Sequence, residues 1–243
     1  MSGEWFARWF GDEYVELYPH RDEREAEAAV DLFLDHVALR PEGRVLDLGC
    51  GAGRHVGVLR RRGVHAIGLD LSAQLLRRAR ATDRGLPVVR GDMRDLPLAT
   101  ASVDAVTSFF TSFGYFRDAR DDARVLQETR RALRAGGRFL LDYLNAPHVR
   151  RHLVPEDDRT VNERTIRQRR RIEEGVVIKE IEILSPAGQR LRRFEERVRL
   201  YEPPELADLL AGAGFGVEAR FGEYGGAPYA EGSSRLILLA DAL

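Results

Sequence analysis

The sequence has a single cysteine, Cys50, and a single lysine, Lys179, among its 243 residues. One cysteine excludes an internal disulfide and a zinc site built from cysteines, and it is typical of proteins from reducing compartments. No segment approaches the roughly 18 uncharged apolar residues of a membrane-spanning helix. The first residues carry acids early and no basic stretch before an apolar run, so we expect no signal peptide and a cytoplasmic location.

The composition is that of an ordinary globular protein, with 44% apolar and 32% charged residues. This length and apolar content suffice for one large domain, or for one domain that carries an insertion. Arginine takes the place of lysine, and 38 basic residues face 39 acidic ones, for a net charge of −1. Acids therefore match the arginines, and the balance does not favour generic binding of polyanions.

Short apolar runs alternate with amphipathic stretches between residues 44 and 143, which is the pattern of a doubly wound parallel sheet. Ser72 is a plausible N-cap for one of the intervening helices, and Gly136 and Gly137 end another. The expected strands are 44–48, 64–70, 87–91, 103–109 and 138–143, and the expected helices are 54–62, 72–81 and 121–134.

The chain changes character between residues 150 and 201. Turn signals at 174–175 and 185–188 separate three stretches, 159–171, 175–184 and 190–201, which predict a three-stranded antiparallel insertion with one buried side. A helix from Pro203 and a closing antiparallel pair, 217–224 and 235–240, then return to the main fold. We therefore expect an α/β domain with a mostly parallel seven-stranded sheet, formed by residues 1–149 and 202–243, and an insertion at 150–201.

The segment from Val45 to Arg54 reads VLDLGCGAGR, so a strand ends, three glycines follow at alternate positions, and a helix begins. Glycines are needed where the backbone turns tightly and a ligand presses against main-chain atoms. The dinucleotide fingerprint G-x-G-x-x-G/A requires a small residue at position 54, where this chain has Arg54. The departure argues against NAD or FAD.

Acidic residues follow two further strands. Asp70 ends the second expected strand, and Asp92 follows the third. Ligands of open α/β sheets lie across the carboxyl ends of the strands. An acid at position 70 can accept both hydroxyls of a ribose, and Asp92 with Met93 can meet the amine and the flat face of a base. Together with the glycine loop, these residues predict a nucleoside site without a phosphate tail.

These motifs resemble those of the class I S-adenosylmethionine-dependent methyltransferases. Val45–Arg54 matches their first motif, Gly68–Ser72 the second and Gly91–Asp95 the third, and Leu133–Asp142 matches their helix, Gly-Gly and strand segment. Residues 9–24 and 107–116 look like a bacterial small-molecule-type group that carries an antiparallel β insertion after the fifth strand. The resemblance implies a Rossmann-like methyltransferase fold, an enzyme, and S-adenosylmethionine as cofactor.

The resemblance also implies roles for single residues toward that cofactor. The glycine-loop backbone would approach the methionyl part, Asp47 would anchor the loop and the amino end, and Asp70 would hold the ribose. Leu71 would pack on the adenine, Asp92 and Met93 would contact its edge, and Phe109 would border the sulfonium. An N-terminal segment would close over the amino-acid end. The implied cofactor-binding residues are Tyr18, Arg21, Asp47, Gly49, Cys50, Gly51, Asp70, Leu71, Asp92, Met93 and Phe109.

A catalytic base is optional for methyl transfer, because the sulfonium donor is already activated and the protein mainly aligns the reactants and excludes water. The candidates by position are Tyr115, Tyr143, His148 and Tyr224, and His148 also fits a surface or capping role. The Asn/Asp-Pro-Pro-Tyr/Phe motif of enzymes that methylate planar amides is absent after the fourth strand. We expect no metal, although Asp142 and Asn145 raise the alternative of a magnesium-dependent site.

Residues 159–201 carry twelve basic residues against seven glutamates. This excess can attract an anionic acceptor or RNA, or it can form cross-strand Arg–Glu pairs on a solvated sheet face. The function we predict is methyl transfer to N or O of a small molecule; an RNA or protein methyltransferase and a noncatalytic cofactor-binding protein are the alternatives. We do not expect nucleic acid or membrane partners. The insertion should roof the acceptor pocket or form a homodimer contact, and contribute little to cofactor binding.

Overall fold

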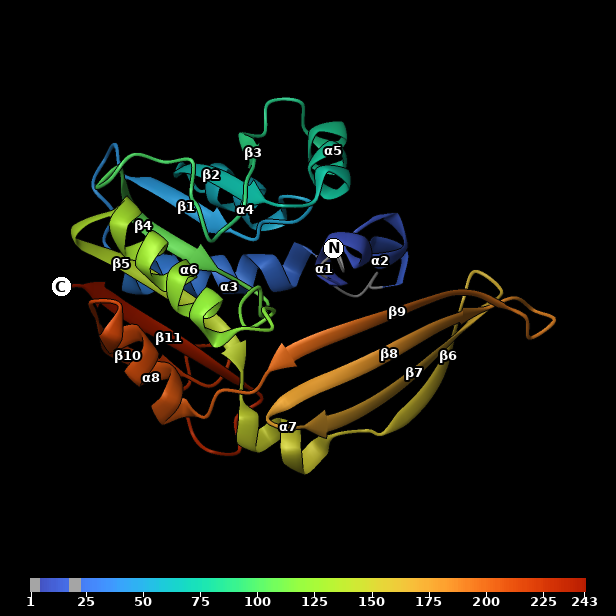
Figure 1. Ribbon diagram of the computed structural model, residues 1–243. Coiled ribbons are helices and arrows are strands. Elements are labelled where there is room, and N and C mark those ends of the chain that lie inside the picture. Colours follow the sequence, from blue (N-terminus) through green and yellow to red (C-terminus); the bar gives the residue numbers. More distant parts are fainter. Residues whose placement is uncertain (1–4, 18–22) are drawn as a thin grey trace.

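The main sheet has seven strands in the order β10-β11-β5-β4-β1-β2-β3 (Figure 1). The computed structural model describes residues 5–17 and 23–243. The strands are β1 (Arg44–Leu48), β2 (His65–Asp70), β3 (Val88–Arg90), β4 (Val103–Ser108), β5 (Leu133–Leu144), β10 (Phe215–Phe221) and β11 (Arg235–Ala242). β11 runs antiparallel to both its neighbours, and the pairs among β1 to β5 are parallel. The predicted doubly wound, mostly parallel seven-stranded sheet is confirmed.

Helices cover both faces of this sheet because its strands bury side chains in both directions. Along β1, Val45 belongs to a core shared with α3 (Glu23–His36), α4 (Arg54–Arg61) and α5 (Ala73–Thr82). Its neighbour Leu46 belongs to the core under α6 (Ala119–Ala132) and α8 (Pro203–Gly212). The carboxyl ends of the strands are thereby left as the accessible edge of the sheet.

The starts of α5 and α8 follow the capping chemistry that the sequence indicates. The prediction that Gly136 and Gly137 end a helix is wrong, because α6 ends at Ala132 and the two glycines lie within β5. Ser72 caps α5, where its side chain accepts a hydrogen bond from the backbone N–H of Leu75 at 3.2 Å. α8 begins with two prolines and a reciprocal capping box between Glu202 and Glu205. The capped start of α5 fixes the segment between Asp70 and Ser72, which belongs to the site described below.

A second sheet lies between β5 and α8 in the chain and has four antiparallel strands, not the three that the sequence predicts. Residues 159–171 form a hairpin instead of one strand, because Asn162 and Glu163 both adopt left-handed backbone angles, φ 48° and 61°, in a two-residue turn. The strands are β6 (Glu156–Val161), β7 (Arg164–Glu173), β8 (Val176–Leu184) and β9 (Arg190–Arg199). The predicted turns at 174–175 and 185–188 are confirmed.

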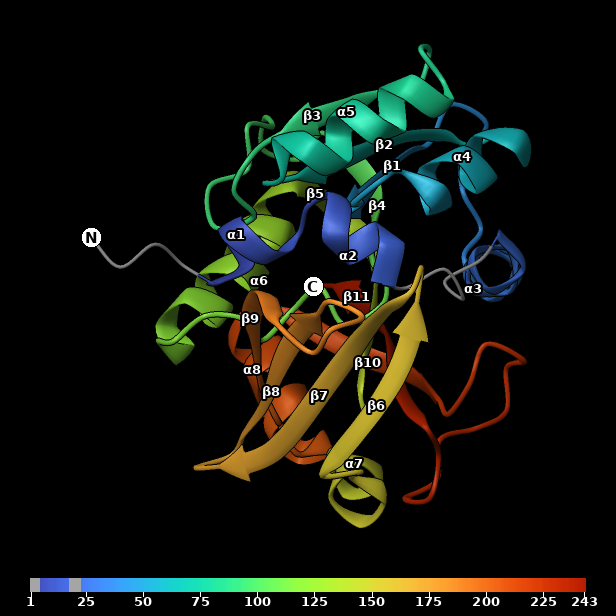
Figure 2. The ribbon, with the colours of Figure 1, turned by 90° about the vertical axis from the view of Figure 1, so that its right-hand side faces the viewer.

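The short N-terminal helices α1 (Trp5–Trp9) and α2 (Asp12–Leu17) lie between α5 and the four-stranded sheet, in both views of the ribbon (Figures 1 and 2). Their buried residues Trp9 and Leu17 share an apolar cluster with the isoleucines of β7 and β8. The short helix α7 (Ala146–His152) leads from β5 into the second sheet. The N-terminal helices therefore bridge the two sheets.

Candidate functional site

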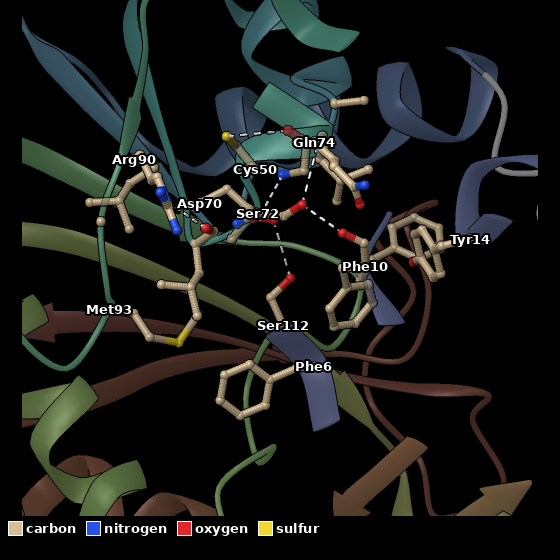
Figure 3. A pocket seen from close by; sticks show the side chains of 18 of the residues that line it. Phe6, Phe10, Tyr14, Cys50, Asp70, Ser72, Gln74, Arg90, Met93 and Ser112 are labelled. Atoms are coloured by element: carbon tan, nitrogen blue, oxygen red, sulfur yellow. Dashed lines mark hydrogen bonds between the residues drawn. The ribbon is translucent and has the colours of Figure 1, made fainter. Parts of the chain in front are cut away.

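A cavity of about 630 Å³ lies at the carboxyl ends of β1, β2, β3 and β4. Its walls come from the glycine loop, the segments that follow β2, β3 and β4, and the helices α1 and α2. Phe6 and Tyr14 reach it from the N-terminal helices, Phe10 from the turn between them, and Asp70 and Met93 from the sheet edge (Figure 3). This is where an open α/β sheet binds its ligands.

The three glycines of the loop after β1 all adopt left-handed angles, φ 74° at Gly49, 55° at Gly51 and 78° at Gly53. A Cβ at Gly49 would lie 2.6 Å from the Cβ of Ser112, so the loop and the segment after β4 approach too closely for any side chain. Cys50 lines the cavity, but its thiol is buried against Gly68 of β2, and burial raises its pKa. The loop therefore presents mainly backbone to the cavity.

Asp47 lies beneath the loop and does not line the cavity. One carboxylate oxygen accepts a hydrogen bond from Thr107 Oγ1 at 3.1 Å, and the other has no partner within the part of the chain that the structure describes. Burial raises the pKa of Asp47 to about 7. A buried carboxylate with an unused oxygen is costly unless it serves a ligand, a water or a proton.

Asp70 stands at the end of β2 and lines the cavity. Its two oxygens accept hydrogen bonds from the backbone N–H groups of Gly51 at 2.8 Å and of Ser72 at 2.7 Å. Burial raises the pKa of Asp70, and these hydrogen bonds oppose the rise. Because a carboxylate offers about four acceptor positions, two remain for a ligand. Leu71, half-buried beside it, also lines the cavity.

Asp92 and Met93 follow β3 and line the same cavity. The carboxylate of Asp92 pairs with Arg94, whose Nη2 lies 2.7 Å from Oδ2. Burial alone would raise the pKa of Asp92, but the hydrogen bonds from Arg94 outweigh it and hold the pKa below its usual value. Arg94 also contacts Asp121 at 3.2 Å and lies over the ring of Phe116. The sequence motifs do not indicate this partner of Asp92.

The segment after β4 holds two consecutive residues in left-handed conformations, Phe110 at φ 59° and Thr111 at φ 56°. For a residue other than glycine, such a conformation costs about 1–3 kcal/mol, and it persists only where the surrounding structure enforces it. Asp142, at the end of β5, enforces it here: its carboxylate accepts from Phe110 N–H at 2.7 Å and its carbonyl accepts from Thr111 N–H at 3.1 Å. Phe109, Phe110 and Ser112 line the cavity.

Asp142 is itself held in a buried network. Arg235 donates to both of its oxygens at 3.1 Å, and Tyr224 donates to it as well. Arg235 also pairs with Glu25 at 3.1 Å, and its guanidinium stacks on the rings of Phe110 and Tyr224. The network therefore fixes the segment after β4 against the rest of the sheet edge.

His55 is a further cavity residue that the sequence analysis did not identify. Its ring stacks on Phe109 with centroids 4.4 Å apart, and its Nε2 has no hydrogen-bond partner among the described residues. Burial, together with the charges of Arg54 and Arg235, lowers the pKa of His55 to about 3. The imidazole is therefore neutral at physiological pH.

Of the predicted catalytic candidates, Tyr115 is the one that lines the cavity. Tyr143 is buried in the core, where its hydroxyl donates to the carbonyl of Arg199, and Tyr224 donates to Asp142. Burial raises the pKa of both phenols. His148 is half-buried on α7 and stacks on His152 at 4.2 Å, outside the cavity. Tyr143, His148 and Tyr224 therefore contact other parts of the protein and do not line this cavity.

The predicted cofactor-binding residues Tyr18 and Arg21 lie outside the described residues. Across residues 5–17 and 23–243, no group of three or more His, Cys, Asp or Glu side chains is arranged to hold a metal ion. Within the same ranges, the structure has no helix long and apolar enough to cross a membrane.

Comparison with protein families matches residues 46–141 to a family described as Methyltransferase domain. Among curated proteins, the demethylmenaquinone methyltransferase of Thermotoga maritima is 35% identical over 132 residues, 54% of this chain and 54% of that protein. The chain thus spans about half the length of such relatives. The uncharacterised protein MJ1252 of Methanocaldococcus jannaschii is 26% identical over 178 residues, 73% of this chain and 63% of that protein.

Solved structures match the fold over nearly the whole chain. The CcbJ methyltransferase from Streptomyces caelestis has a TM-score of 0.81 at 20% identity, with 96% of this chain and 98% of that chain covered. The sugar N-methyltransferase KedS8 from a Streptoalloteichus species has a TM-score of 0.70 at 24% identity, with 95% and 93% covered. The domain match thus assigns a methyltransferase domain to residues 46–141, and the solved methyltransferases share the fold of the chain. Both findings agree with the resemblance of the sequence motifs to class I S-adenosylmethionine-dependent methyltransferases.

Proposed function

We propose that this protein transfers the methyl group of S-adenosylmethionine to a nitrogen or oxygen of a small molecule. The observation that carries the proposal is the cavity wall itself, in which a glycine loop with no room for a side chain at Gly49 stands beside the Asp70 carboxylate. A nucleoside with an amino-acid tail fits such a wall, whereas the loop spacing does not suit a pyrophosphate.

The residues present fit that cofactor. Asp70 keeps acceptor positions for the ribose hydroxyls, and Leu71 and Met93 offer apolar contact to the base. Asp47 lies beneath the glycine loop and does not line the cavity, so its predicted role toward the amino end of the cofactor stays a prediction. When bound, S-adenosylmethionine supplies an activated methyl group on a sulfonium. The task left to the chain is to align an acceptor and to exclude water.

The acceptor would be aligned by the aromatic side of the cavity. Phe10 stacks with Tyr115 at 5.6 Å, and Phe6 packs on Phe116 at 5.5 Å. Tyr115 supplies a hydroxyl at this wall, so it is the residue we propose to orient the acceptor or take its proton. The similarity of fold to a sugar N-methyltransferase and to an amino pentose methyltransferase supports a small acceptor.

The RNA alternative depends on the excess of basic residues in the four-stranded sheet, and several of these arginines form ion pairs with acids of the same sheet. Arg167 lies 2.9 Å from Asp158, while Arg171 and Arg193 lie 2.7 and 2.9 Å from Glu180. The predicted cross-strand ion pairs are confirmed, and they leave less charge for phosphates. This favours the small-molecule acceptor.

Calorimetry with S-adenosylhomocysteine tests the donor site. Asp70→Ala removes two charge-assisted hydrogen bonds to the ribose, each worth roughly 1.5–3 kcal/mol, so affinity should fall at least about tenfold. Thermal unfolding without ligand checks the fold of the variant. Binding of NAD but not of S-adenosylhomocysteine, or unchanged affinity in folded Asp70→Ala, would contradict the proposed site.

A transfer screen with radiolabelled donor tests the acceptor. Small amines and alcohols should be methylated at a rate that hardly depends on salt, and Tyr115→Phe should lower kcat more than it lowers donor affinity. Methylation of RNA with steep salt dependence would instead support the RNA alternative. Donor binding without transfer to any class of acceptor would favour a noncatalytic protein.

A further inference from the structure

The N-terminal segment contacts both the cavity and the four-stranded sheet. Phe6 of α1, Phe10 just after it and Tyr14 of α2 line the cofactor cavity. Trp9 and Leu17 are buried in an apolar cluster with isoleucines of β7 and β8, and Phe10 and Tyr14 also pack against that cluster. We call residues 5–17 the strap, since this segment lines the cavity and packs on the four-stranded sheet. Figure 2 shows it between α5 and that sheet.

The strap is fixed to the cavity next to the proposed ribose site. Ser72 Oγ donates a hydrogen bond to the carbonyl of Phe10 at 2.6 Å, two residues after Asp70. A Cβ at Gly11 would lie 2.3 Å from Gln74 Oε1, so the backbone passes close to the start of α5. The Trp5 indole N–H donates to the carbonyl of Tyr115 at 3.2 Å. The strap therefore contacts the side of the cavity that we propose to bind the cofactor.

The four-stranded sheet holds the opposite side of the strap. The Trp9 ring lies 4.5 Å from that of Phe194 on β9, and its N–H donates to Glu196 Oε1 at 2.5 Å. Glu196 is itself paired with Lys179 of β8 at 3.4 Å. Trp9 is 1% exposed, which is unusual for a large residue in so short a helix.

More of the sheet holds the second half of the strap. Arg159 of β6 donates to the carbonyl of Leu17 at 2.5 Å, and Arg164 of β7 lies 2.7 Å from Glu16. Helices of five and six residues are not stable alone in water, so packing on the sheet must hold them in place.

We infer that the four-stranded sheet is part of the donor site, because it clamps the strap over the cavity and thereby slows the release of the cofactor and its product. Trp9, Phe194 and Glu196 are then positioning residues that act through Phe6, Phe10 and Tyr14. The inference rests on the proposed function, and it reverses the expectation that residues 150–201 contribute little to cofactor binding.

The two tryptophans of the chain, Trp5 and Trp9, both lie in α1 and provide a fluorescence signal for the strap. Stopped-flow mixing with S-adenosylhomocysteine gives its association and dissociation rates without a known acceptor. Phe194→Ala should raise the dissociation rate by about tenfold or more and change the association rate by less than about threefold, since a closed strap mainly retains bound ligand.

Variants of Glu196 distinguish loss of the contact with the strap from general destabilisation of the sheet. Glu196→Ala removes the acceptor of the Trp9 N–H and should raise the dissociation rate, whereas Glu196→Gln keeps an acceptor oxygen and should restore most of the wild-type rate. Arg193→Ala is the matched control, because Arg193 lies on the same strand, faces the other side and pairs with Glu180. S-adenosylhomocysteine should dissociate from Arg193→Ala at the wild-type rate.

The inference is overturned if Phe194→Ala and Glu196→Ala fold, as thermal unfolding without ligand reports, and release S-adenosylhomocysteine at the wild-type rate. Should both variants unfold, Glu16→Ala gives the same test at an exposed strap contact, with a smaller rise in dissociation expected and an unchanged rate overturning the inference. If wild-type protein fails to bind S-adenosylhomocysteine at all, the proposed function fails first.

Discussion

Replacing Asp142 by alanine should both destabilise the fold and loosen the segment after β4. The change leaves the Phe110 N–H without its acceptor and removes one of the two acids that pair with the mostly buried Arg235. Breaking a buried ion pair from one side costs about 3–5 kcal/mol. Because Arg235 keeps Glu25, we expect the lower end, about 3 kcal/mol, which corresponds to a Tm lower by about 6–12 °C for a chain of this size.

Thermal unfolding followed by circular dichroism measures this shift. Asp142→Asn keeps an acceptor for Phe110 and should lose less, while Asp158→Ala, which removes an exposed partner of Arg167, should leave Tm nearly unchanged. The strained residues Phe110 and Thr111 should relax in Asp142→Ala, so the affinity for S-adenosylhomocysteine should fall as well. A folded Asp142→Ala protein with Tm within about 2 °C of wild type would refute the reasoning.

Two further predictions concern the glycine loop and a second buried acid. Gly49→Ala should weaken S-adenosylhomocysteine binding, since the new Cβ would lie 2.6 Å from the Cβ of Ser112. Gly63→Ala is the control: Gly63 also has a left-handed backbone, but a Cβ there would meet no atom within 4 Å. Calorimetry should therefore show normal binding for Gly63→Ala. Burial raises the pKa of Asp122 from 3.8 to about 6, so the folded state binds more protons and stability falls as pH rises between those values. We expect the free energy of unfolding of Asp122→Asn, measured with urea, to rise relative to that of wild type by up to about 3 kcal/mol between pH 4 and pH 7. Parallel pH profiles of the two proteins would contradict this.

The main sheet could be predicted because its signals are local. The strands β1, β2 and β3 are short apolar runs that end at or just before a glycine or an acid, and Ser72 caps α5 through an atom three residues away. The number of strands in the second sheet could not be predicted, because the signal for its first turn is weak. Asn162 favours left-handed angles, but it stands alone. Residues 162–163 form the tight turn of a hairpin without a glycine, and Glu163 is not a residue that favours left-handed angles.

The positions of the acids could be predicted, but their partners could not. Parallel strands bring Asp70 and Asp92 to one edge, which follows from the fold class. The stacking of His55 on Phe109 and the contact of Asp142 with Tyr224 join residues more than fifty positions apart, and only tertiary packing decides them. A signal for Asp142 existed, since it lies near the end of β5 as Asp70 ends β2.

The aromatic residues of α1 explain why the second sheet could not be assigned a role from sequence. Helical spacing joins Trp5 to Trp9 and Phe6 to Phe10, which indicates one packed face and does not tell which unit it packs against. In the structure, Trp9 is buried on the four-stranded sheet, while Phe6 of the same helix and Phe10 just after it line the cavity, so this short segment contacts both. A change in the second sheet that alters acceptor access would therefore also move the wall of the donor site. Acceptor choice and donor retention are then coupled through the strap, and variants of the sheet should be assayed for both.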